Sequence, residues 1–317
     1  MKVKFVFMLC LVASILFVSC SEEQTVATIV NFFDMKDCQA PVLLEVNSTS
    51  SSSVSLVFDE EVYPIESSFD SMNIKALGCV LEVELPFTLT PDSYYDLKGR
   101  VKDVCGNSNL FSVRVWGYNQ NPASAVINEF STKGTENQPD RTEILITERG
   151  NIAGLVLYDG VPGDSKKSVI LPYAELSTGD FVVVYWTDKL PSTVSSTEHV
   201  VYVCAESESS LSDDNGILTL TSSPSQGSRV LDCAVYSSFT SSQYEGFGTK
   251  AVLTRVEKAR EENWWLSSAI NSRTSTSTRT MCRYPNSMDT DTADEWYICE
   301  TRGQSFGKEN NGVPYSP

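Results

Sequence analysis

Histidine is almost absent from this chain of 317 residues, which contains only His199. An enzyme with Ser-His-Asp or Cys-His chemistry would have to rely on that one side chain, and a zinc site would obtain a single imidazole ligand. The cysteines include no C-x2-C pair, so their spacing does not support a zinc ribbon or a redox-active dithiol. These absences disfavour the commonest catalytic and zinc-binding classes, and we expect a protein that is not an enzyme.

Positive charge is also scarce. The chain has 24 Lys and Arg against 41 Asp and Glu, which gives a formal net charge of −17 at pH 7. Because proteins hold nucleic acids largely by neutralising phosphates with Lys and Arg, this balance disfavours a nucleic-acid partner. Apolar runs are short, helical periodicity is rare and Ser and Thr are abundant, so a mainly β fold is expected. The length allows two domains of ordinary size.

No apolar run beyond the N-terminus approaches the roughly 20 residues that a membrane-spanning helix needs. At the N-terminus, Lys2 and Lys4 precede an almost wholly apolar stretch, residues 5–18. This is the length and order of an export signal, and residues 1–19 are predicted to be a signal peptide.

Residues 17–20, Phe-Val-Ser-Cys, resemble a bacterial lipobox, in which a small residue precedes a cysteine that is lipidated and begins the mature chain. Phe17 departs from the usual Leu. The resemblance implies acylation of Cys20, with palmitate for example, and each buried CH₂ group adds ~0.8 kcal/mol to membrane binding. The lipid membrane is then a partner, residues 20–36 form a tether, and the protein lies in a bacterial cell envelope, periplasmic or surface-exposed. An ordinary secretory signal cleaved nearby is the alternative.

Seven cysteines follow the lipidation site, and disulfides are the default in an exported protein. Two pairs lie within one apparent domain each: Cys204 with Cys233, and Cys282 with Cys299. Because seven is odd, at least one thiol is left over, and we expect Cys79 to be a small buried hydrophobe. The seven are Cys38, Cys79, Cys105, Cys204, Cys233, Cys282 and Cys299.

Residues 37–118 contain β runs separated by turn clusters, in the order CQAPVLLEV, VSLVFDEEV and PDSYYDLKGRVKDVCGN. The order resembles bacterial immunoglobulin-like modules, and the residues at the pattern positions are Pro41, Phe58, Glu60, Val62, Tyr95, Leu97, Asp103, Gly106 and Asn107. The resemblance implies a spacer without catalytic residues. In such a sandwich Cys38 and Cys105 lie at the same end, so we expect them to form a disulfide.

Residues 119–124 form a turn-rich linker, and residues 125–311 follow with a second set of β runs and a 312–317 tail. This second set resembles the lamin-tail domain, an immunoglobulin-like sandwich, although Phe306 replaces the usual Pro before Gly307. The residues that carry the resemblance are Ile127, Asn128, Glu129, Glu143, Leu155, Asp159, Leu176, Gly179, Asp180, the runs 181–185, 216–220 and 232–236, Arg283, Asp289, Thr290, Asp294, Trp296, Gly307 and Asn310. Asn128 and Glu129 are interpreted as polar groups that tie down loop backbone rather than as a catalytic pair.

An insert of about residues 248–280 interrupts this second module. Thr254 and Glu257 have the spacing of a capping box, which predicts a helix over the residues that follow. Trp264 and Trp265 are expected to pack this helix on the sandwich, or alternatively to form an exposed aromatic patch that binds a partner.

Asp289, Asp291 and Asp294 have a spacing at which their carboxylates can meet a Ca²⁺ ion. The loop lacks the central Gly and the distal Glu of an EF-hand, so calcium is only a weak candidate and no cofactor or firm metal site is predicted.

The sequence thus predicts a mainly β protein with two immunoglobulin-like β-sandwich modules in tandem and one helical insert in the second. The function that fits is a membrane-anchored lipoprotein that presents a non-catalytic, lamin-tail-like module to an unknown protein or envelope ligand, or that organises the envelope. Two alternatives remain open: an accessory module of an exported nuclease or phosphatase system, and direct DNA binding, which lamin relatives suggest and the charge opposes.

Overall fold

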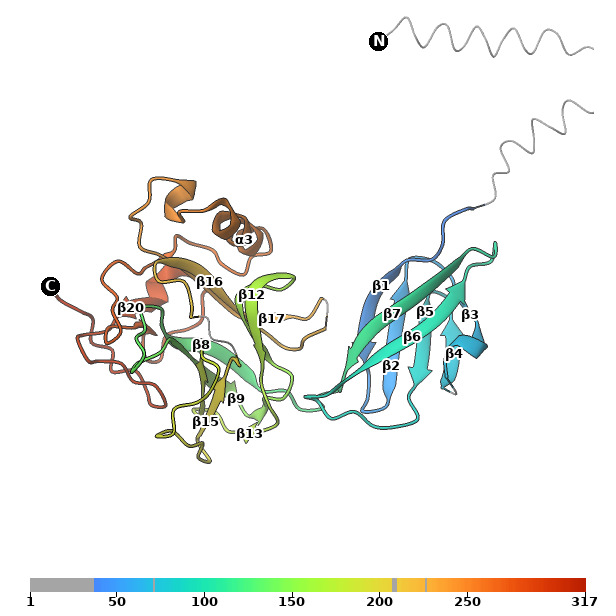
Figure 1. Cartoon of the computed structure of the whole chain (residues 1–317), viewed down its shortest axis with the longest axis horizontal. Helices are drawn as coiled ribbons and strands as arrows, with labels where there is room; N and C mark the ends of the chain where they lie inside the picture. The colour runs from blue at the N-terminus through green and yellow to red at the C-terminus, as the bar shows by residue number, and fades with distance from the viewer. Residues whose placement is uncertain (1–36, 71, 207–209, 226) are drawn as a thin grey trace, which may run out of the picture.

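The structure is a computed structural model that describes residues 37–317 except 71, 207–209 and 226. The predicted signal peptide, the predicted lipidation site Cys20 and the 20–36 tether lie outside the described residues. Strands dominate the described chain, which folds into two β-sandwich modules joined by one connection (Figure 1). This confirms the predicted fold class.

The first module packs a four-stranded sheet, in the order β1-β2-β5-β4, against a three-stranded sheet, in the order β3-β6-β7. Alternating side chains of β2, β5 and β6 point into a core of its own, as a half-buried antiparallel strand requires. Its elements are β1 Leu43–Ser48, β2 Ser53–Phe58, β3 Tyr63–Pro64, η1 Glu66–Ser68, β4 Asn73–Leu77, β5 Val80–Glu84, β6 Tyr94–Lys102 and β7 Ser108–Trp116.

The second module packs a six-stranded sheet, β15-β14-β9-β8-β19-β20, against a five-stranded sheet, β12-β11-β16-β17-β18, with the small pair β10-β13 at one side. A separate and larger core fills the space between them. Its strands are β8 Ser124–Ser131, β9 Arg141–Glu148, β10 Gly150–Asn151, β11 Val156–Val161, β12 Asp164–Ile170, β13 Glu175–Leu176, β14 Phe181–Tyr185, β15 Val200–Cys204, β16 Asn215–Thr221, β17 Val230–Ser237, β18 Ile270–Asn271, β19 Met281–Arg283 and β20 Trp296–Ile298.

Apolar runs of the sequence explain how these strands are arranged. The continuous apolar run at β14 is a buried strand with a partner on each side, antiparallel β9 and parallel β15. The runs on either side of the polar cluster near residue 225 pair as the antiparallel hairpin β16-β17.

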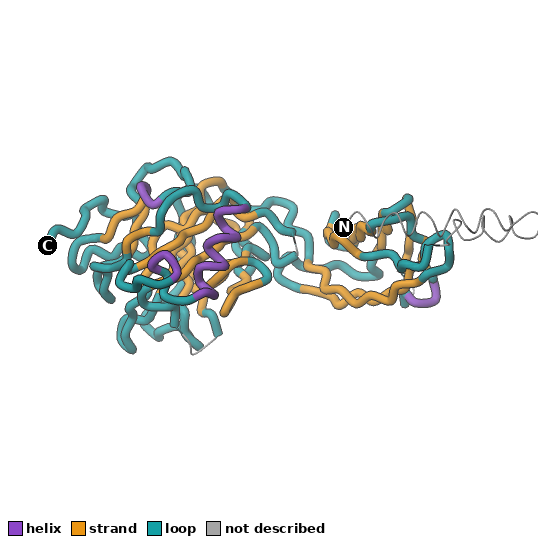
Figure 2. Tube along the Cα trace, turned by 90° about the horizontal axis from the view of Figure 1, so that it is seen from above, coloured by secondary structure: helices purple, strands orange, loops and turns teal. Residues whose placement is uncertain are grey.

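The helical insert contains α3, Lys250–Glu261, and the short turns η2, Tyr244–Gly246, and η3, Ala293–Glu295, flank it in the chain. The predicted capping box at Thr254 is wrong. The helix begins earlier, because Thr249 Oγ1 accepts a hydrogen bond from Val252 N at 3.3 Å, and Thr254 lies inside it. The helix lies along the outside of the five-stranded sheet, on β16 and β11 (Figure 2). Among the described residues, no helix has both the length and the apolar character needed to cross a membrane.

Candidate functional site

The C-terminal segment 305–310, here called the strap, lies across the outer face of the six-stranded sheet and is held by two buried carboxylates. Glu129, on β8, accepts hydrogen bonds from the Ser305 amide and hydroxyl, both at 2.9 Å, and from Thr280 Oγ1 at 2.5 Å. Glu143, on β9, accepts from Asn128 Nδ2 at 2.7 Å and from the Gly307 amide. These carboxylates therefore bind the protein's own chain.

The far end of the strap is fixed in the same way. Asn310 Nδ2 donates to the carbonyl oxygens of Asn128, at 3.1 Å, and Arg283, at 2.8 Å. Gly307 has a φ of +81°, and a Cβ there would come within 2.9 Å of the Tyr202 hydroxyl, so the turn favours glycine. The interpretation of the polar residues at the start of the module as structural ties fits this geometry.

Burial makes these carboxyl groups weak acids. Burial first, and then the charge of the neighbouring Glu129, raise the pKa of Glu143 to about 8. Burial also raises the pKa of Glu129, and it raises the pKa of Asp140 to about 6. At neutral pH, Glu143 is therefore mostly protonated.

We expect the second module to lose stability as the pH rises from 5.5 to 8.5. A carboxyl whose pKa is higher in the folded than in the unfolded state binds its proton more tightly when the protein is folded. Its contribution to the free energy of unfolding is therefore greatest below the unfolded pKa, and it is lost as the pH rises through the folded pKa. For Glu143 and Asp140 that window runs from about pH 4 to 8. The melting temperature should fall by about 5 °C or more over this range.

Thermal unfolding of the mature chain carrying Cys20→Ala, followed by circular dichroism at several pH values, measures this slope. In Glu143→Gln, which is always neutral, the slope should become shallower. A melting temperature that rises with pH would contradict the assignment.

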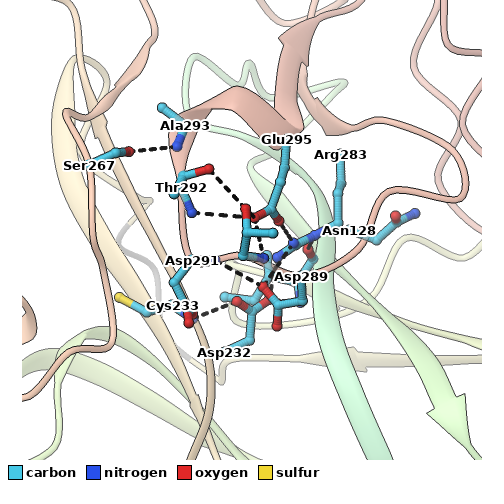
Figure 3. Close-up of polar contacts among 12 residues, drawn as sticks. Asn128, Asp232, Cys233, Ser267, Arg283, Asp289, Asp291, Thr292, Ala293 and Glu295 are labelled. Atoms are coloured by element: carbon cyan, nitrogen blue, oxygen red, sulfur yellow. Dashed lines mark hydrogen bonds and ion pairs between the residues drawn. The ribbon is translucent and has the colours of Figure 1, made fainter.

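Arg283, on β19, is the centre of a second polar cluster, drawn in Figure 3. Its guanidinium group donates to Asp232 at 2.8 Å, to Asp289 at 3.2 Å and to Glu295, while its Nε donates to the Ile127 carbonyl at 3.0 Å. The Arg283 side chain is only 5% exposed, and the Asp232 side chain is fully buried. One guanidinium thereby ties together β19, β17, β8 and the 289–295 loop.

Carboxylates outnumber cations in this cluster. Asp232, Asp289 and Asp291 each offer an oxygen within 4.8 Å of the others. Burial, with a contribution from Asp289, raises the pKa of Asp232 to about 7, although Arg283 lowers it, and burial followed by the charges of Asp289 and Glu295 raises the pKa of Asp291 to about 6. The cluster thus carries negative charge that Arg283 does not neutralise.

The predicted calcium set is only partly brought together. Asp289 and Asp291 meet, but the third member of the group is Asp232, from β17, and Asp294 is exposed and not part of it. The sequence spacing missed Asp232 because it comes from a strand some fifty residues upstream. Asp232 and Arg283 both stand among the residues that resemble the lamin-tail pattern, and this shared membership is the signal that could have identified Asp232.

The structure contradicts the predicted disulfide between Cys204 and Cys233. Both are free thiols, and they lie in different sheets. Cys233 faces the core between the sheets, whereas Cys204 Sγ points to the Asp188 carbonyl, 3.8 Å away. Proximity along the chain was misleading here, because Val201 and Val203 of β15 face the core, so Cys204 points to the opposite side of its sheet.

Cys282, on β19, and Cys299, directly after the edge strand β20, by contrast lie together as buried thiols. Both contact Thr280 Oγ1, at 3.4 and 3.2 Å. A hydrogen bond from Cys282 lowers the pKa of Cys299 to about 7, which favours the thiolate that starts disulfide exchange.

We expect these two thiols to be joined in protein isolated from an oxidising compartment, with a stabilisation of about 3 kcal/mol for the short loop that the bond closes. A reductant should then lower the melting temperature of the second module in the wild type but not in Cys282→Ala. Mass spectrometry after alkylation under denaturing conditions reads the bond directly. Full alkylation of both cysteines without reductant would contradict the prediction.

The other cysteines belong to the first module. Asn107 Nδ2 donates to the Asp37 carbonyl at 2.9 Å, so the segments that carry Cys38 and Cys105 meet at one end of the sandwich. The bond between those two cysteines stays a prediction. Cys79 is not buried as expected: it lies exposed in the turn between β4 and β5.

The two predicted binding aromatics have different environments. Trp265 is 1% exposed, donates from Nε1 to the Ser268 carbonyl at 3.1 Å, and packs in the main core. The alternative prediction, that Trp265 belongs to an exposed patch that binds a partner, is therefore wrong. Trp264 is half-buried, with Lys258 Nζ 5.8 Å from its ring centre, and keeps one side toward solvent.

A cavity of about 370 Å³ opens beside the strap on the outer face of the six-stranded sheet. Its floor is an apolar row of three side chains in register across adjacent strands: Val126 on β8, Leu145 on β9 and Phe181 on β14. Arg283 and Asn128 also line it, so the cavity adjoins the Arg283 cluster.

A family model described as a protein second domain, TP_1001_2nd, matches residues 123–298, just over half of the chain. The match starts at the beginning of β8 and ends with β20, so it covers both sheets of the second module and all of the Arg283 cluster. Comparison with curated proteins and with solved structures finds no match. The chain therefore belongs to the TP_1001_2nd family.

Proposed function

We propose that this protein is a lipid-anchored, non-catalytic binding protein of a bacterial cell envelope. In this proposal the first module is a spacer, and the second module, which resembles a lamin-tail domain, presents the binding surface. The proposal takes the N-terminal lipobox as the anchor.

One observation carries the non-catalytic part. Glu129 and Glu143, the buried carboxyl groups that resemble an acid and base pair, accept hydrogen bonds from the strap and from neighbouring side chains. A general base must reach a substrate proton, and these groups are covered by the chain itself. They support a rigid module whose ligand contacts lie elsewhere.

The anchor is tested by metabolic labelling of the cells with a clickable palmitate analogue. The wild-type protein should be labelled and should sediment with membranes, because several acyl CH₂ groups hold it there. Cys20→Ala should lose the label and be released. Cys79→Ala serves as the matched control, since this exposed thiol should not affect either result. Retained labelling in Cys20→Ala would remove the anchor from the proposal.

The non-catalytic assignment is tested with the purified mature protein. Nuclease or phosphatase turnover above background, abolished by Glu143→Gln but not by a surface substitution, would overturn it. Protease treatment of intact cells separates a surface-exposed binder from a periplasmic one.

A further inference from the structure

The cavity beside the strap combines an apolar floor with acidic walls. The floor is the row Val126, Leu145 and Phe181, and Tyr284 forms part of one wall. The Tyr284 ring is held by stacking on Tyr297, with ring centres 4.6 Å apart and planes 28° apart. Such a surface accepts methylene groups, and an aromatic face also attracts a cation.

Negative charge predominates around this floor. Asp289 and Glu309 both line the cavity, and Asp232 and Asp291 lie close behind Asp289. Among the described residues that line it, Arg283 is the only Lys or Arg, and its guanidinium is already bonded to three carboxylates.

Two of the wall carboxylates have unused acceptors. In the part of the chain that the structure describes, no donor reaches Glu309 or the Oδ2 atom of Asp289, whose Oδ1 receives Arg283 at 3.2 Å. Both residues are exposed, so an incoming group can reach them.

We propose that this cavity binds a lysine side chain of a partner protein, with the alkyl stem over the apolar row and the ammonium group between Glu309 and Asp289. The ammonium supplies the charge that the walls lack, and the four-carbon stem matches the floor in chemistry. The volume lies within the range of ligand pockets, about 300–1,000 Å³. Anionic ligands are disfavoured by the same carboxylates. The inference deepens the proposed binding function by naming the ligand class, and it does not depend on the lipid anchor.

Titrations followed by amide NMR shifts test the inference on the mature chain with Cys20→Ala. The probes are n-butylammonium, which copies the side chain, and Nα-acetyl-lysine methylamide, which adds the backbone of a partner. Both should bind saturably with dissociation constants on the order of millimolar, and shifts should concentrate at Asn128, Thr147 and Gly179, which line the cavity. 1-Butanol should bind at least about fivefold more weakly, and butanoate more weakly still.

The variant Glu309→Gln should weaken n-butylammonium binding about threefold to fivefold, and added salt should reduce the difference. Glu257→Gln, at an exposed position on α3 away from the cavity, is the matched control and should bind like the wild type. Equal binding of 1-butanol, or no saturable shift with either cation, would overturn the inference. If n-butylammonium binds but the lysine derivative does not, the ligand of the cavity is a small free amine and not the lysine side chain of a partner protein. If palmitate labelling shows that Cys20 is not lipidated, the binding of amines in this cavity is unaffected.

Discussion

Replacing Arg283 with methionine is expected to destabilise the second module by about 3–5 kcal/mol, enough to unfold it at moderate temperature. Methionine keeps much of the apolar stem but removes the guanidinium. Asp232 and Glu295, both buried, would then lose their cation, and the Ile127 carbonyl would lose its donor. The cost comes from the buried charges left behind, which is why one substitution has so large an effect. Chemical denaturation of the mature chain measures it.

The matched control is Arg260→Met, which removes an exposed ion pair with Glu245 in the same module; there the side chains are 36% and 57% exposed. Exposed pairs contribute little, so a change of about 0.5 kcal/mol or less is expected. If the two variants unfold at the same denaturant concentration, the Arg283 cluster is not a structural centre of the module.

Replacing Trp265 with alanine is expected to cost about 3–5 kcal/mol, the usual range for a fully buried aromatic residue. The ring belongs to the same core cluster as Val252, Val256 and Ala259 of α3, and this helix packs on β16 and β11. Its loss would leave a cavity in this core and would remove one of the two donors to the Ser268 carbonyl, the other being Ser267 Oγ at 3.0 Å.

Trp264→Ala provides the comparison within one dipeptide. Since Trp264 is only half-buried, a loss of about 1 kcal/mol is expected. A larger effect at Trp264 than at Trp265 would show that the helix packs on the sandwich through the other ring. The Trp264 variant also tests whether the remaining exposed aromatic surface contributes to partner binding.

Features that depend on local pattern were predictable from the sequence. The apolar run of β14, the hairpin of β16 and β17, and the division into two β modules all follow from periodicity and turn residues. The start of α3 was not predictable from the sequence, because both Thr249 and Thr254 can cap a helix. Only packing of the helix against β11 and β16 decides between them.

Features that depend on which strands lie side by side were harder to predict. Cys282 and Cys299 are neighbours because β19 and β20 pair, whereas Cys204 and Cys233 are separated because Cys233 faces the core and Cys204 faces away from it. The chain separations are 29 and 17 residues, and a disulfide can close a loop of either length, so spacing alone cannot distinguish the two pairs. Asp232 joined the acidic cluster for the same reason: its register opposite β16 and its contact with Arg283 are set by the sandwich, not by the loop that contains Asp289.

The strap has a consequence for the order in which the second module folds. Glu129 and Glu143 belong to the first two strands of the module, yet their partners Ser305 and Gly307 follow them by 176 and 164 residues. Contacts of such large sequence separation form late and slowly. A chain cut short before the strap would expose two buried carboxyl groups and an uncovered sheet face, which makes it a ready target for proteolysis. The stability of the first two strands of this module therefore depends on a segment more than 160 residues further along the chain.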